Sequence, residues 1–183
     1  MRPEASDDKY HHIEYLHFMI DQLQGMIRYI DSKHALGITL VASLLFASNE
    51  FIFPKILGIG GTTEIVYRVA IFSAICAIFF GFMGIFPRLI PPFAVRSRHR
   101  GAPNILYFQE IYGTDIDTVR KVIDETFPNS GLSLAYRESG LHEIYALSQI
   151  VMVKLRMFEW FMFTLLVYLT ATIWLLLFAP KAG

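Results

Sequence analysis

Three long apolar runs constrain the fold of this chain more than any other feature of its sequence. Val69–Pro87 and Trp160–Pro180 contain no charged residue, and Ala35–Phe53 contains only Glu50. Each run is close to the ~20 residues that a helix needs to cross about 30 Å of hydrocarbon. Buried helices of soluble bundles usually keep a polar stripe, which the last run lacks. The sequence therefore predicts an all-α membrane protein with three transmembrane helices.

The composition agrees with a membrane protein, and by itself it excludes few other classes of protein. Hydrophobic residues make up 54% of the 183 positions, and the formal net charge is zero. Cys76 is the single cysteine, so the chain can form no internal disulfide and no thiolate-rich metal site. The N-terminus does not resemble a signal peptide, because Met1–Lys9 is polar and the first apolar run begins only near Ala35.

Lysine and arginine residues predict the orientation in the membrane. Most of them lie before the first run or between the second and third runs, and only Lys55, Arg68 and Lys181 lie elsewhere. Cytoplasmic segments carry the excess of basic residues in most membrane proteins. We therefore expect a cytoplasmic N-terminus, a cytoplasmic middle segment and an external C-terminus.

The chain is thus expected to consist of seven segments. They are a cytoplasmic N-terminal helix (1–34), a first span (35–53), an external loop (54–68), a second span (69–87), a cytoplasmic segment (88–157), a third span (158–179) and an external tail (180–183). The N-terminal helix and the segment between spans two and three should form a small, mostly helical cytoplasmic domain.

Apolar residues recur at spacings of three and four in both cytoplasmic segments. One row comprises Ile13, Leu16, Ile20, Leu23, Ile27 and Ile30, and the other comprises Leu141, Ile144, Ser148, Val151, Leu155 and Phe158. Such rows are typical of helices that pack along a seam, within one chain or between copies. Both helices should continue directly into the adjoining spans. Asp115–Phe127 predicts a further helix, with Thr114 or Asp115 as its N-cap.

Charged residues cluster just before the first and last spans. Asp31 and Lys33 precede the first span, and Lys154 and Arg156 precede the last. If the two long helices pack side by side, these residues converge, and cations around an acid could bind a phosphate. The alternatives are a charged collar at the membrane surface and basic side chains that extend to lipid headgroups.

A second basic patch follows span two and consists of Arg96, Arg98 and Arg100. Binding to anionic lipid is its expected role, and capture of a nucleotide phosphate is the alternative. The sequence has no P-loop, G-x-G-x-x-G, H-E-x-x-H or G-x-S-x-G motif. We therefore expect no catalytic residue, no metal site, no cofactor and no binding of nucleic acid.

The order of several short motifs resembles a known family. Ile30–Ala35 (IDSKHA) leads into the first span, Phe86-Pro87 ends the second, and Asn104–Ile111 (NILYFQEI) and Lys154–Arg156 (KLR) follow. In this order they resemble the transmembrane effectors of bacterial Pycsar anti-phage defence, from about Tyr15 to Phe178. His34 occupies a position at which that family usually has alanine.

The resemblance implies a function that the spacing of residues does not. A partner cyclase would make a cyclic nucleotide during phage infection, and this protein would respond by impairing the integrity of the bacterial inner membrane, halting the infected cell. The resemblance implies a cyclic nucleotide as activating ligand and no enzymatic activity. We also expect a homo-oligomer.

Two other functions are compatible with a membrane protein of this size. One is a membrane anchor or sensor subunit whose soluble partner protein does the work. The other is a membrane enzyme or small transporter, which the spans disfavour because they lack paired acids, histidine and lysine near mid-membrane.

Overall fold

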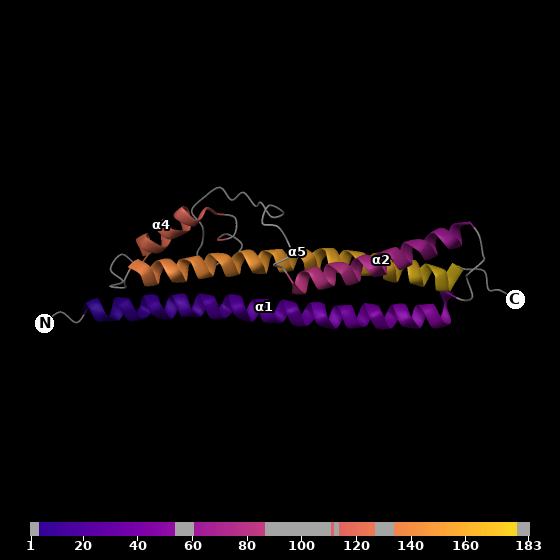
Figure 1. Cartoon of the computed structure of the whole chain (residues 1–183), viewed down its shortest axis with the longest axis horizontal. Coiled ribbons are helices and arrows are strands. Elements are labelled where there is room, and N and C mark those ends of the chain that lie inside the picture. The colour runs from indigo at the N-terminus through magenta and orange to yellow at the C-terminus, as the bar shows by residue number, and fades with distance from the viewer. Residues whose placement is uncertain (1–3, 54–60, 87–110, 112–113, 127–133, 179–183) are drawn as a thin grey trace. The chain divides into compact units, whose positions relative to one another are not determined.

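The computed structural model describes residues 4–53, 61–86, 111, 114–126 and 134–178. Figure 1 shows their four helices, which are α1 (Glu4–Phe51), α2 (Thr62–Ile85), α4 (Ile116–Thr126) and α5 (Leu134–Phe178). The described residues contain no strand, which confirms the all-α prediction. Three of the helices, α1, α2 and α5, are long and apolar enough to cross a membrane, as predicted.

The chain divides into two compact units. The first, here called the polar unit, comprises Met1–Tyr29 and Ile90–Val153, and the second, the apolar unit, comprises Ile30–Leu89 and Lys154–Gly183. Both α1 and α5 contribute their first residues to the polar unit and their later residues to the apolar unit. The prediction that the two long helices continue into the spans is therefore confirmed.

The apolar unit packs α2 against α1 and α5 through small residues. The buried face of α2 consists of Thr63, Ala70, Ser73, Ala74, Ala77, Gly81 and Gly84. Large side chains such as Phe72 and Phe79 lie on its exposed face. In a bilayer, helices associate through close packing of small residues, and exposed apolar side chains face lipid. This arrangement therefore suits a hydrocarbon environment.

One hydrogen bond joins the buried parts of α1 and α5 in the apolar unit. The hydroxyl groups of Ser48 and Tyr168 lie 2.9 Å apart, and both side chains are buried. Because hydrocarbon offers no alternative partner, one of the two hydroxyl groups donates to the other. The bond fixes the register of α1 against α5.

In the polar unit, the predicted seams form much of the core. Leu16, Leu23, Leu141, Ile144, Ser148 and Val151 are buried, whereas Ile13, Ile20 and Ile27 are only partly buried. Met19, which the sequence did not single out, is buried beside them. The buried row of α1 thus follows residues 16, 19 and 23, which is a heptad spacing.

Helix α4 completes the polar unit and confirms the predicted helix. Asp115 caps it, because the carboxylate of Asp115 accepts a 3.1 Å hydrogen bond from the backbone N–H of Asp117. Two ion pairs connect α4 to α5: Arg137 with Asp124, and Arg120 with Glu138 at 2.9 Å. The hydrogen bond to Glu138 raises the pKa of Arg120 above its usual value.

Candidate functional site

Lys154 is the most unusual charged residue in the apolar unit. Its side chain is only 3% exposed, yet it carries an ammonium group. The ammonium donates to a carboxylate oxygen of Asp31, to the carbonyl oxygen of Gly84 at 3.0 Å and to the carbonyl oxygen of Ile85 at 3.2 Å. An ammonium has three hydrogens, so these three acceptors satisfy it completely.

These contacts cap the end of α2. Gly84 and Ile85 are the last two residues of that helix, and carbonyl groups in the last turn have no partner within the helix. The C-terminal end of a helix is also the negative end of its dipole, which favours a cation. The ammonium group of Lys154 therefore contacts α2 at two backbone carbonyl groups and α1 at the carboxylate of Asp31.

His34 lies next to this cluster and is completely buried. Its Nδ1 is 2.9 Å from the carbonyl oxygen of Ile30, which requires a hydrogen on Nδ1. The Nε2 atom is buried and has no hydrogen-bond partner among the described residues. The ring contacts Phe158 edge-on, with 5.3 Å between ring centroids. The side chain of His34 thus fills space between α1 and α5.

Two glycines of α2 permit a close approach to α1. A Cβ atom added at Gly84 would lie 2.1 Å from Nε2 of His34, and one added at Gly81 would lie 2.6 Å from Cγ1 of Ile38. Real Cβ atoms do not make contacts this short, so any side chain here would force α1 and α2 apart. The absence of a Cβ at these positions serves packing within one chain.

The sequence-predicted site residues thus fall into three groups. The structure brings Asp31 and Lys154 into direct contact, as expected if α1 and α5 pack side by side. Lys33 and Arg156 are exposed. The basic patch of Arg96, Arg98 and Arg100 lies outside the described residues. A role for any of these residues in binding a ligand stays a prediction.

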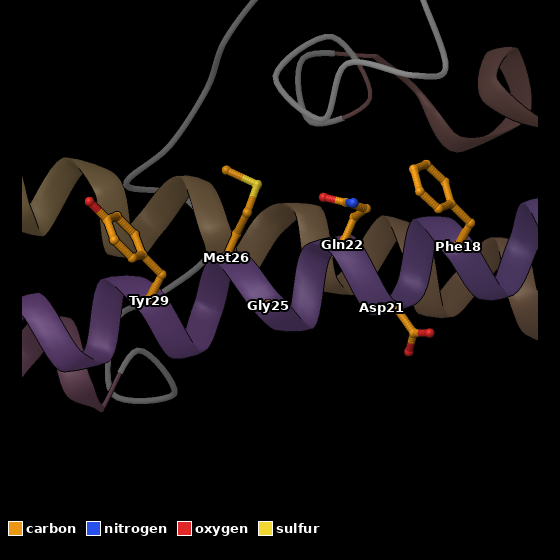
Figure 2. A pocket seen from close by; sticks show the side chains of 6 residues that line it. All are labelled: Phe18, Asp21, Gln22, Gly25, Met26 and Tyr29. Atoms are coloured by element: carbon orange, nitrogen blue, oxygen red, sulfur yellow. The ribbon is translucent and has the colours of Figure 1, made fainter.

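A groove of about 400 Å³ lies along α1 in the polar unit. Figure 2 shows that Phe18, Gln22, Met26 and Tyr29 point to one side of the helix, with Gly25 between them. Asp21 also lines the groove and points in another direction. No atom lies within 4 Å of a Cβ position at Gly25, so the middle of the groove is open.

The groove combines two kinds of side chain. Phe18 and Tyr29, 54% and 63% exposed, offer aromatic faces near its ends. Gln22 offers a hydrogen-bonding amide between them (Figure 2). Aromatic faces stack on planar rings, and an amide both donates and accepts hydrogen bonds. The groove is therefore suited to a planar, polar molecule such as a nucleobase.

The groove and the cap on α2 were not predicted from the sequence. The groove residues recur at spacings of three and four on the exposed side of α1, a signal that a search for exposed aromatic residues on one helix face could have found. Two of the three acceptors that hold Lys154 are backbone carbonyl groups, which carry no signature in the sequence.

Comparison with families of known proteins gives one match that covers most of the chain. The model of the Pycsar effector protein domain matches residues 15–180, which include α2, α4, α5 and most of α1. Comparison with curated proteins and with solved structures finds no significant match. The family match and the three apolar helices agree with the resemblance seen in the sequence, and the chain therefore belongs to the Pycsar effector family, whose members are membrane effectors of anti-phage defence.

Proposed function

We propose that this protein is a signal-gated membrane effector. It binds a cyclic nucleotide made by a partner cyclase and then impairs the integrity of the bacterial inner membrane. The observation that carries the proposal is the family match over residues 15–180 in a chain with three apolar helices. A protein that responds to a cyclic nucleotide needs a surface that binds it. The apolar helices of the same chain are the part that can act directly on the membrane.

The two units suit a division of labour between sensing and action. The polar unit has the charged contacts of a water-exposed fold, such as Arg137 with Asp124. The apolar unit has a lipid-compatible surface of exposed large side chains, such as Phe72 and Leu166. A ligand shifts a conformational equilibrium only by its differential affinity for the two states. We therefore place the nucleotide on the polar unit and its effect in the apolar unit.

The groove on α1 is a surface of the polar unit that fits part of a nucleotide. A base stacked on an aromatic ring gains about 1–3 kcal/mol, and Phe18 and Tyr29 both offer such a ring. The amide of Gln22 can read the edge of the base, because it both donates and accepts hydrogen bonds. The groove thus accommodates the base.

The phosphate of the nucleotide needs a cation, and the described groove residues include none. The sequence offers Arg96, Arg98 and Arg100 in the segment that joins α2 to α4. Arginine binds phosphate oxygens in a bidentate geometry. We propose that this basic patch binds the phosphate of the nucleotide, and that anionic lipid headgroups compete with the phosphate for the same arginine side chains.

The effect on the membrane follows from assembly and not from catalysis. Three helices are too few to line a water path, so several copies would surround a lesion. We propose that the protein acts as a homo-oligomer without enzymatic activity, with its N-terminus and polar unit in the cytoplasm. The uneven distribution of lysine and arginine supports this orientation.

Release of a trapped dye from reconstituted vesicles tests the proposal. Cyclic mononucleotides of each common base are added first, and cyclic oligonucleotides second. The proposal predicts rapid release with at least one of them and no release without nucleotide. If the protein is correctly inserted but no nucleotide causes release, the proposal is overturned. A soluble protein that is recovered with it at a fixed stoichiometry in a pull-down from native cells would favour the anchor-subunit function.

Variants of the groove test where the nucleotide binds. Gln22→Ala and Phe18→Ala should each raise the nucleotide concentration needed for release by roughly tenfold, the effect of losing about 1.4 kcal/mol. Gln24→Ala is the matched control, because Gln24 is exposed on the same helix but does not line the groove. Equal nucleotide dependence in all three variants would place the ligand elsewhere while leaving the effector function intact.

A further inference from the structure

Helix α2 is attached to the rest of the apolar unit by a face of small residues. Alanine, glycine and serine dominate that face, as at Ala74, Ala77 and Gly81. In lipid there is no hydrophobic driving force between helices, so attachment depends on close packing and on polar contacts. Small side chains make few atomic contacts each. The polar contacts of α2 therefore contribute a large share of what holds it.

Lys154 makes a charged contact with the end of α2. One buried ammonium group binds the last two carbonyl oxygens of α2, at 3.0 and 3.2 Å, and the carboxylate of Asp31 on α1. Removing one partner from a buried charge leaves the other uncompensated, which is strongly unfavourable. All three helices of the apolar unit thus meet at one side chain.

The position of this contact along the chain is also informative. The apolar unit begins at Ile30 on α1 and at Lys154 on α5. Asp31 and Lys154 are therefore among the first residues of that unit on both helices that come from the polar unit. A displacement along either helix would enter the apolar unit at or next to these residues.

We propose that Lys154, Asp31 and the last two carbonyl groups of α2 form a latch that keeps the apolar unit closed, and that release of α2 from this latch is the step that impairs the membrane. The inference rests on the proposed effector function and assigns its regulation to named residues. Release would uncover polar groups that are now buried, including the hydroxyl groups of Thr63 and Ser73 on α2. Uncovered polar groups within a bilayer attract water.

Dye release from vesicles without any nucleotide tests the latch. Lys154→Met keeps the length of the side chain but removes its three donors. We expect release about tenfold or more above the wild-type rate, because a buried charged contact commonly biases an equilibrium by at least that factor. Lys121→Met is the matched control, because Lys121 is exposed on α4, outside the apolar unit, and should keep the wild-type rate.

A reversible cross-link distinguishes release of α2 from general damage. Ile38→Cys and Gly81→Cys, with Cys76→Ala, place two thiols on facing positions of α1 and α2. The Ile38→Cys change also removes the Cγ1 and Cδ1 atoms with which a Cβ at Gly81 would collide. Oxidation of this pair in the Lys154→Met background should return release to the wild-type rate, and a reductant should restore it. Release that persists after complete cross-linking would overturn the latch.

A second variant tests the latch if Lys154→Met protein fails to insert into vesicles. Gly84→Ala forces His34 away from α2 without removing any charge, so it should also raise release in the absence of nucleotide. Inserted Lys154→Met or Gly84→Ala protein that releases no more dye than wild type would contradict the proposal. If these variants release dye but the wild type ignores every nucleotide, the latch stands and nucleotide gating fails.

Discussion

Lys154 of α5 donates a 3.0 Å hydrogen bond to the carbonyl oxygen of Gly84, the second-last residue of α2. The two residues are 70 positions apart in the sequence. The same glycine leaves room for His34, since an added Cβ would lie 2.1 Å from its Nε2. A single backbone position therefore links α2 to α5 by a hydrogen bond and to α1 by close packing.

Gly84→Ala should lower stability, and a second substitution should restore part of it. The added methyl group would collide with His34, and overpacking of this kind typically costs about 1–3 kcal/mol. Replacing His34 by alanine as well removes the collision. Thermal unfolding in detergent should thus show that the double variant loses less stability than Gly84→Ala and His34→Ala lose together. If the double variant loses more stability than the two single variants lose together, the packing of His34 against Gly84 is contradicted.

The hydrogen bond between Ser48 and Tyr168 should be measurable by a double-mutant cycle. Ser48→Ala and Tyr168→Phe each remove one hydroxyl group from a buried pair. Hydrogen bonds between helices in membranes are worth about 0.6 kcal/mol on average and up to about 1.7. We expect a coupling free energy of unfolding within that range. Additive effects of the two substitutions would show that the hydroxyl groups do not interact.

Docking of α4 on α5 depends on two ion pairs in the polar unit. Arg137→Met breaks the contact with Asp124, whose carboxylate is partly exposed. The loss should be about 1 kcal/mol, near the upper end for pairs that water can reach. Hydrogen exchange in α4 should then rise about fivefold, while exchange in α2 stays unchanged. Lys121→Met, which affects only an exposed contact at 4.0 Å, is the control.

The orientation in the membrane can be tested by labelling single cysteines. In a Cys76→Ala background, Thr62→Cys reports on the start of α2, and Lys121→Cys reports on α4. Positive charge predicts that α4 is cytoplasmic. A membrane-impermeant maleimide should thus label position 62 in intact spheroplasts and position 121 only after lysis. The reverse pattern would invert the proposed topology.

Much of the fold could be predicted from the sequence, because periodicity and hydropathy act locally. The three apolar helices, the continuity of α1 and α5 through Ile30 and Lys154, and helix α4 were all predicted. The row on α1 was placed partly in the wrong register: Met19 is buried where Ile20 was expected. Both residues are apolar, so hydropathy alone does not distinguish them.

The site was less predictable, because its main contacts are made by the backbone and by packing. The sequence placed Asp31 and Lys154 at corresponding positions, but it gave no sign that Lys154 would bind the carbonyl groups of α2. The burial of His34 depends on the missing side chain at Gly84, a relationship between two helices. Such long-range relationships require the assembled structure.

The most direct test of the proposed function is uptake of a membrane-impermeant DNA stain by living bacteria. Cells express this protein together with a nucleotide cyclase under separate induction. We predict that stain enters only when both proteins are present, and that Lys154→Met admits stain without the cyclase. Cells that contain the inserted protein and the cyclic nucleotide it binds, yet exclude the stain, would contradict the proposal that this protein impairs the membrane in response to a nucleotide.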